Sequence, residues 1–162
     1  MKKNFEILCL LFLFGSLLLS ENSHAQLKTY SFEQIDSLQI IEKRKIVVFI
    51  HTDWCKYCQA MKNTTFKNKD IIALLNSKFY FVDLNAEERK SIRFNGNIFE
   101  YKPTGNQTGI NELATEIGVI DGFISYPTLC FLNDRNEILF QKNGFIESAK
   151  FIQVLNVFSI EK

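Results

Sequence analysis

Two cysteines that lie three positions apart, Cys55 and Cys58, follow directly after Trp54 in the stretch Asp53-Trp54-Cys55-Lys56-Tyr57-Cys58. This spacing allows three kinds of chemistry: a disulfide that is reduced and re-formed, half of a tetrahedral metal site, or a static structural disulfide. A disulfide between residues so close in sequence closes a very short loop, and short loops contribute little entropic stabilisation. The spacing therefore favours a redox pair over a structural cross-link.

A metal site is the weaker alternative. The other candidate ligands are Cys130 and His51, and the sequence contains no second Cys-x-x-Cys pair. No histidine follows directly after Cys58, so the stretch is not a haem attachment sequence. Two thiolates could still carry a soft metal, so a metal-binding or interaction protein without redox turnover stays open as the alternative function. We expect no cofactor and no resident metal.

The segments on either side of the pair predict where the chain places it. Residues 46–50 form a continuous run of β-branched and aromatic side chains, typical of a strand inside a covered sheet. Residues 55–63 contain no glycine or proline and have helical spacing. Cys55 would then open a helix, where backbone N–H groups and the helix dipole lower a thiol pKa from its usual value of about 8.5. We predict that Cys55 is the nucleophile and that Cys58, one turn later and better shielded, is the resolving thiol.

The remaining elements indicate an α/β fold. Ser31 and Gln34 form a capping box that opens a helix, Asn68 is a candidate N-cap, and Asn95-Gly96 is a strong signal for a hairpin turn. The predicted helices are 32–43, 55–63, one after Asn68, 110–117 and a last one around 151–158; the predicted strands are 46–50, 79–84, a hairpin over 92–99, 128–132 and 137–141, with a loop over 101–109. Strands that alternate with helices should be parallel, and the last two strands, joined by a tight turn, antiparallel.

Three features of the chain resemble the thioredoxin superfamily over roughly residues 30–160. Trp54-Cys55-Lys56-Tyr57-Cys58 follows a strand and opens a helix, Tyr126-Pro127-Thr128 precedes a later strand, and the chain ends in a hairpin and a helix. The resemblance implies a thioredoxin-like fold with a central mixed sheet flanked by helices. An inserted hairpin and loop around residues 86–109 resembles exported thioredoxin-like proteins of Bacteroidetes-type bacteria.

The resemblance also implies roles for residues around the two cysteines. Pro127 would follow a cis peptide bond and face the cysteines, which would leave the backbone of Tyr126 free to pair with a substrate strand. Trp54 would lie beside the cysteines, partly exposed, and Lys56 and Tyr57 would shape the site between them. Loops on a rigid scaffold often carry specificity, so the inserted segment is where we expect partner selectivity.

The sequence departs from thioredoxin at two places. Phe49 and Phe81 occupy the positions that we match to thioredoxin's buried aspartate and lysine, so the proton acceptor that this pair supplies there is missing. Lys56-Tyr57 replaces Gly-Pro, and both changes leave the direction of electron flow open. His51 is interpreted as a satisfied polar residue at a strand end, without a role in proton transfer, and Cys130 as a buried core thiol.

The first 25 residues have the layout of a secretory signal peptide. Lys2 and Lys3 precede an apolar run over 7–19, and Ser23-His24-Ala25 offers small residues for cleavage after Ala25. The run is shorter than the about 20 residues that span a bilayer, although an uncleaved anchor is the alternative. We therefore predict a signal peptide over 1–25, a thioredoxin-like domain over 26–162, and a periplasmic or otherwise exported protein, where disulfides persist.

The composition limits the class of partner. Hydrophobic residues make up 46% of the chain and charged residues 23%, a balance typical of a folded globular domain, and a net charge of +1 gives no sign of a nucleic-acid surface. We expect an exported thiol–disulfide oxidoreductase that reduces or interchanges protein disulfides. Its partners would be protein disulfide or dithiol substrates and an unidentified redox protein, with no membrane contact after cleavage and a monomeric chain.

Overall fold

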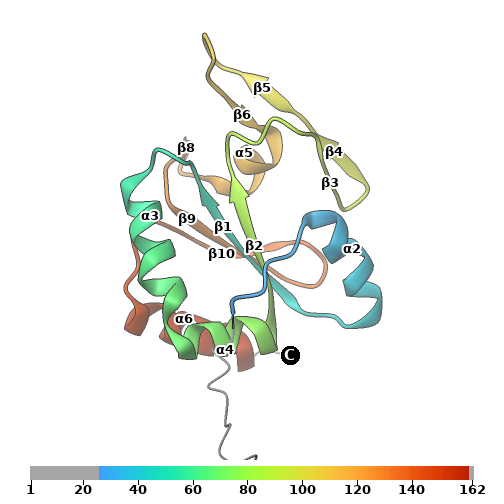
Figure 1. The fold of residues 1–162 in the computed structure, drawn as a ribbon. Helices are drawn as coiled ribbons and strands as arrows, with labels where there is room; N and C mark the ends of the chain where they lie inside the picture. The colour runs from blue at the N-terminus through green and yellow to red at the C-terminus, as the bar shows by residue number, and fades with distance from the viewer. Residues whose placement is uncertain (1–25, 161–162) are drawn as a thin grey trace, which may run out of the picture.

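The computed structural model of the protein describes residues 26–160 (Figure 1), so the predicted signal segment and its cleavage point lie outside the described residues. No helix in the described part of the chain is both long enough and apolar enough to cross a membrane. In chain order the elements are α2 (Phe32–Ile41), β1 (Lys45–His51), α3 (Lys56–Asn63), the 3₁₀ helix η1 (Thr65–Lys67), α4 (Lys69–Lys78), β2 (Phe79–Asn85), β3 (Ile92–Phe94), β4 (Asn97–Phe99), β5 (Tyr101–Pro103), β6 (Gly109–Asn111), α5 (Glu112–Gly118), β7 (Val119–Ile120), β8 (Phe123–Ile124), β9 (Thr128–Leu132), β10 (Ile138–Asn143) and α6 (Ser148–Ile160).

The centre of the molecule is a four-stranded mixed sheet with the strand order β10-β9-β1-β2. β1 runs parallel to β2 and antiparallel to β9, and β9 runs antiparallel to β10. Figure 1 shows α3, α4 and α6 on one side of the sheet and α2 and α5 on the other. This arrangement confirms the predicted α/β fold with a central mixed sheet, and it makes β1 an inner strand that is covered on both faces.

The side chains of β1 alternate between two hydrophobic cores, as the pleat of a strand requires. Val47 and Phe49 pack with residues of α3, α4 and α6, in the same core as both cysteines of the Cys-x-x-Cys pair. Ile46, Val48 and Ile50 pack on the other face with residues of α2 and α5. The strand that leads to the cysteines is thus fixed from both sides.

Most predicted elements are present, with shifted ends. The capping box of Ser31 and Gln34 is confirmed, and Asn68 caps α4 by accepting hydrogen bonds from the backbone N–H groups of Asp70 and Ile71. The first helix stops at Ile41 instead of continuing to residue 43, because the backbone at its C-cap is extended. The later helix begins at Glu112, two residues after the predicted start, since the side chain of Asn111 is its N-cap.

The predicted loop over residues 101–109 is wrong, because its two ends pair as the antiparallel strands β5 and β6. Pro103, at the end of β5, cannot donate a hydrogen bond to a strand ladder. In a two-stranded ribbon, however, outward-facing N–H groups need no partner, so proline is tolerated at the strand end. The hairpin of β7 and β8 was also not predicted, although Asp121-Gly122, with φ of 52° and 82°, has the sequence of a two-residue turn.

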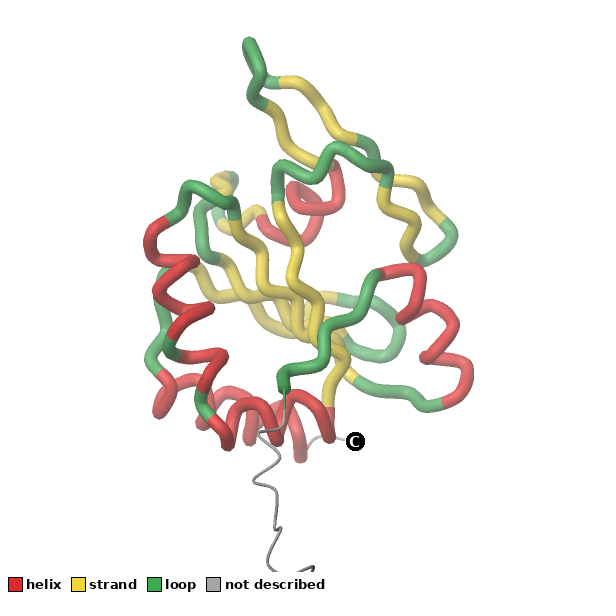
Figure 2. The backbone as a smooth tube through the Cα atoms, in the orientation of Figure 1, coloured by secondary structure: helices red, strands yellow, loops and turns green. Residues whose placement is uncertain are grey.

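The inserted segment extends beyond the end of the sheet at which β1 and β2 finish (Figure 2). Its predicted hairpin around Asn95-Gly96 is confirmed as β3–β4, with φ of 51° and 75° at the two turn residues. The hairpin is attached to α2: Glu33 accepts a hydrogen bond from the Arg93 backbone, and the ring of Phe94 lies 4.7 Å from that of Phe32. Part of the insertion is therefore anchored to the body of the domain.

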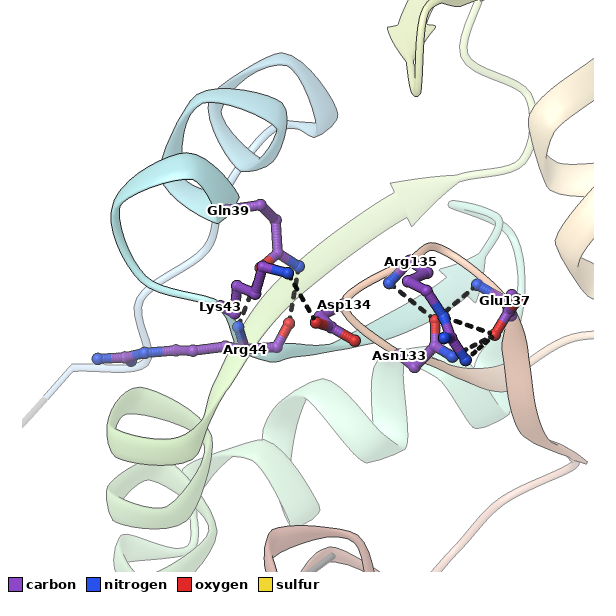
Figure 3. A network of polar contacts seen from close by, with 7 residues as sticks. All are labelled: Gln39, Lys43, Arg44, Asn133, Asp134, Arg135 and Glu137. Carbon is purple, nitrogen blue, oxygen red and sulfur yellow. Dashed lines mark hydrogen bonds and ion pairs between the residues drawn. The ribbon is translucent and has the colours of Figure 1, made fainter. Parts of the chain in front are cut away.

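The end of the sheet opposite the cysteines is closed by the turn between β9 and β10 (Figure 3). Asn133 accepts hydrogen bonds from the backbone N–H groups of Arg135 and Glu137, which holds the turn. Lys43, in the connection between α2 and β1, forms a 3.5 Å ion pair with Asp134. The pair is exposed, so we expect it to contribute little to stability.

The segment before α2 lies along β2, which is an edge strand of the sheet. The backbone N–H of Tyr30 donates a 2.9 Å hydrogen bond to the carbonyl of Phe81 in β2. The amide of Asn76 in α4 bonds the backbone of Lys28 and of Gln26. These contacts fix the start of the described chain against the edge strand.

Asn111 is the residue whose removal should loosen the insertion most. Its side chain is fully buried, caps α5 through Leu113, and donates to the carbonyls of Glu88 and Lys90. We expect Asn111→Ala to lower the free energy of unfolding by about 1–3 kcal/mol, because it leaves buried backbone groups unpaired. Urea denaturation measures the change. Asn156→Ala, at an exposed position of α6, is the control and should lie within about 0.5 kcal/mol of the wild type; an equal effect of the two would contradict the assignment.

Candidate functional site

Cys55 and Cys58 are joined by a disulfide at the start of α3, with their Cα atoms 5.2 Å apart. Cys55 is the N-cap of α3, and its Sγ accepts a 3.1 Å hydrogen bond from the backbone N–H of Cys58. When the disulfide is reduced, the same N–H group and the helix N-terminus favour a thiolate on Cys55. Cys55 is 5% exposed and Cys58 is 0% exposed, so the two sulfurs differ in how far a partner can reach them.

An aromatic rim surrounds the disulfide. Trp54 and Tyr57 are each 68% exposed, and the ring of Trp54 meets that of Tyr126 edge to face at 6.0 Å. The indole N–H of Trp54 donates a 3.1 Å hydrogen bond to Glu87, near the start of the inserted segment. The structure therefore brings Trp54 together with Tyr126 and the insertion, and leaves Lys56 and Tyr57 exposed to solvent between the cysteines.

The peptide bond between Tyr126 and Pro127 is cis. The carbonyl of Pro127 accepts a hydrogen bond from Gly144, and Thr128 Oγ1 donates one to the carbonyl of Ser125, so both sides of the bend are fixed. Among the hydrogen bonds within residues 26–160, none involves the backbone of Tyr126. Burial and the nearby charge of Glu87 raise the pKa of the Tyr126 hydroxyl to about 12, so it stays neutral at physiological pH.

A polar cluster that the sequence analysis did not predict lies on the cysteine face of the sheet, and of its three residues only His51 is buried. His51 Nε2 at the end of β1 is 2.8 Å from Asp83 Oδ1 in β2, and Lys62 Nζ in α3 is 2.9 Å from Asp83 Oδ2 and 3.0 Å from His51 Nε2. His51 follows Val47 and Phe49 on the face that packs against α3. The interpretation of His51 as a satisfied polar residue holds for Nε2, whereas its buried Nδ1 has no hydrogen-bond partner among the described residues.

The sheet register explains why this cluster was missed. The residue beside Phe49 on the neighbouring strand is Asp83, whereas Phe81 lies beside Val47. Phe81, which the sequence analysis compared with thioredoxin's lysine, is therefore not the cross-strand neighbour of Phe49, and that neighbour carries a charge. Two signals in the sequence could have found the cluster: Asp83 interrupts an otherwise apolar run, and Lys62 follows Cys58 by four residues, which places both on one face of a helix.

Asp83 is held in its charged form by its two partners. Partial burial, the largest single influence, disfavours the carboxylate, but the hydrogen bonds and charges of His51 and Lys62 outweigh it and lower the pKa of Asp83. The cluster is thus a set of interacting charged and polar groups rather than three independent residues.

The other cysteine of the described chain, Cys130, is separate from this chemistry. It lies fully buried in β9, and burial raises the pKa of its thiol to about 12. Such a thiol is unreactive at neutral pH. Within residues 26–160, no three His, Cys, Asp or Glu side chains gather into a group that could hold a metal ion.

The pairing of Asp83 predicts a specific loss of stability in acid. A carboxyl whose pKa is lowered by folding stabilises the protein above its unfolded pKa, and this contribution disappears as the pH falls through the lower folded pKa. We expect Asp83→Asn to lower the free energy of unfolding at neutral pH, and the gap to the wild type to close as the pH falls below the usual value of 3.8. Denaturant titrations at a series of pH values measure this. The exposed Asp134→Asn is the control, and a gap for Asp83→Asn that does not depend on pH would contradict the pairing.

Comparison with known proteins agrees with the geometry. Among solved structures, the chain is similar to one titled DsbH oxidoreductase (17% identity, 89% of this chain and 94% of that chain, TM-score 0.58). It is also similar to a thioredoxin from Thermus thermophilus (21% identity, 83% and 88% covered, TM-score 0.59) and to a thioredoxin-fold protein from Helicobacter pylori (18% identity, 86% and 78% covered, TM-score 0.56). At these identities the likeness shows the fold.

No curated protein sequence matches the chain. The family described as the thioredoxin-like domain matches it over residues 32–159, which is most of its length. The cysteine pair at the start of α3, the preceding Trp54 and the mixed sheet all lie within that match. The chain therefore belongs to the thioredoxin-like domain family.

Proposed function

We propose that the protein is a thiol–disulfide oxidoreductase that acts on protein disulfides through Cys55 and Cys58. The observation that carries the proposal is the unequal placement of the two sulfurs. Cys55 lies at the N-cap of α3 and accepts a backbone hydrogen bond, whereas Cys58 lies one turn inside the helix and is fully buried. A nucleophile needs access and a stabilised thiolate, and a resolving thiol needs only to reach its neighbour.

The reaction follows from these positions. In the reduced protein the Cys55 thiolate attacks one sulfur of a substrate disulfide, and the substrate's other sulfur leaves as a thiolate. The resulting mixed disulfide joins Cys55 to the substrate. The thiolate of Cys58 then attacks Cys55 Sγ, forms the Cys55–Cys58 disulfide and releases the second substrate sulfur. The same steps in reverse would oxidise a substrate dithiol.

The surroundings of the cysteines favour a polypeptide substrate. The exposed rings of Trp54 and Tyr57 supply apolar contact area of the kind that protein partners use. The backbone of Tyr126, which has no hydrogen bond within the described residues, would accept an extended substrate segment as an added strand. Lys56 and Tyr57, between the cysteines, and the insertion linked to Trp54 through Glu87 would contribute to the choice of partner.

The pattern of the first 25 residues supports export and cleavage after Ala25. We favour a reducing or interchange role for a monomeric protein, free of the membrane after cleavage.

Variants of each cysteine test the proposal in an insulin reduction assay with dithiothreitol. We expect Cys55→Ser to reduce the rate to that of dithiothreitol alone, because no nucleophile remains. Cys58→Ser should instead accumulate mixed disulfides with its substrates, since the second step is blocked. Cys130→Ala is the matched control and should keep the wild-type rate, because its thiol is buried in β9. A wild-type protein that does not accelerate insulin reduction would refute the enzymatic function.

The reduction potential of the pair separates a redox disulfide from a structural one. We expect equilibration with glutathione to give a potential above about −300 mV, because structural disulfides typically resist the glutathione pool below that value. The measurement follows the fraction of the Cys55–Cys58 disulfide as the ratio of reduced to oxidised glutathione is varied. A pair that stays fully oxidised throughout the titration would support a static cross-link.

A further inference from the structure

An open groove in the inserted part of the chain has no role in the reaction described above. It lies where β4, the β5–β6 hairpin and α5 meet (Figure 1), and its volume is about 630 Å³. This volume lies within the range of ligand pockets in proteins. All of its lining residues lie between Asn97 and Glu116, so the inserted segment and the helix that follows it build the groove together.

The floor of the groove is apolar. Phe99 of β4 and Ile110 of β6 are partly buried and pack against the core on the α2 and α5 side of the sheet. Ile98, which precedes Phe99, is 58% exposed although its side chain is large and aliphatic. All three side chains line the groove, so together they offer apolar area that a partner would remove from water.

The wall of the groove carries an excess of negative charge. Lys102 Nζ lies 3.3 Å from a carboxylate oxygen of Glu100 and 3.1 Å from one of Glu112, so two carboxylates share one ammonium group. Glu116, one helical turn after Glu112 on α5, is exposed and has no ion pair or hydrogen bond from its side chain within the described residues. A cationic group of a partner can therefore pair with Glu116 without breaking an existing contact.

Hydrogen bonds hold the groove in shape and join it to the rim of the disulfide. The backbone N–H of Glu112 donates to the carbonyl of Glu100, and the backbone N–H of Glu100 donates to the Glu112 carboxylate. The backbone N–H of Asn111 donates a 2.8 Å hydrogen bond to the carbonyl of Ala86, the residue before Glu87. Glu87 in turn holds the tryptophan beside the disulfide. A partner thus meets a groove that is already formed, which lowers the entropy lost on binding.

We propose that this groove binds a positively charged, amphipathic segment of the polypeptide partner. The inference rests on the proposed function and names the class of polypeptide on which the cysteine pair acts. An apolar side chain of the partner would cover Ile98, Phe99 and Ile110, and a neighbouring lysine or arginine would pair with Glu116. An acidic segment would meet uncompensated negative charge, so the groove selects against it.

Binding can be measured apart from the redox reaction with two short, cysteine-free peptides. Both have the same leucines, and the positions between these are lysines in one peptide and glutamates in the other. Fluorescence anisotropy of the labelled peptides gives their affinities for the oxidised protein. We expect the lysine peptide to bind about tenfold more tightly than the glutamate peptide, and its affinity to fall as salt is added. Equal affinities, or no binding of the lysine peptide, would overturn the proposal.

Matched substitutions locate the binding site. Glu116→Lys reverses the charge of the wall, and Ile98→Thr makes the floor polar while keeping a β-branched side chain; both positions are exposed. We expect Glu116→Lys to weaken binding of the lysine peptide by about threefold to tenfold and Ile98→Thr by about twofold to fivefold. The controls are the same changes at exposed positions outside the groove, Glu147→Lys before α6 and Ile138→Thr in β10, which should stay within about twofold of the wild type. Equal losses in the variants and their controls would contradict the proposed site.

A disulfide-containing peptide with either segment as a tail connects binding to the reaction. We expect the wild type to reduce the lysine-tailed peptide with a kcat/KM about fivefold higher than that for the glutamate-tailed one, and Glu116→Lys to remove this preference. A wild type that reduces both peptides equally well would overturn the inference and leave the proposed function intact. A wild type that binds the lysine peptide but reduces neither tailed peptide would refute the proposed function instead.

Discussion

The hydrogen bond from the Cys58 backbone to Cys55 Sγ depends on a single constraint: β1 must end so that α3 begins at Cys55. The strand can hold that position because it is buried on both faces and paired on both edges, parallel to β2 and antiparallel to β9. A backbone hydrogen bond from Cys55 to Thr52 closes the short connection between strand and helix. The reactivity of one sulfur atom is thus set by the packing of the whole sheet.

The sequence was most informative where local patterns and tertiary packing agree. The apolar run of β1, the capping box at Ser31 and the Asn95-Gly96 turn each have a local signal, and the structure contains all three elements. The β5–β6 hairpin could not be predicted in the same way, because its strands have three residues each and include Pro103. Its pairing becomes visible only once Asn111 fixes the return of the chain to the domain.

The residues of the site likewise fall into those that local sequence patterns indicate and those that only the folded structure brings together. The two cysteines and Trp54 are consecutive or nearly so, and their chemistry follows from spacing. The polar cluster joins residues of β1, α3 and β2, so it depends on a register between strands that the sequence does not display. The sequence analysis considered Phe49 and Phe81 on these strands and did not consider Asp83, which lies beside Phe49. Polar groups in contact across three elements are the kind of feature for which a three-dimensional structure is needed.

The contact between Tyr30 and β2 has a consequence for how the protein meets other chains. An edge strand with unpaired backbone groups invites pairing with a foreign strand, and natural proteins commonly cover such edges. Because the segment before α2 already occupies the Phe81 carbonyl, an extended polypeptide finds less free backbone at the β2 edge. The segment before α2 therefore limits strand pairing with another chain at the β2 edge of the sheet.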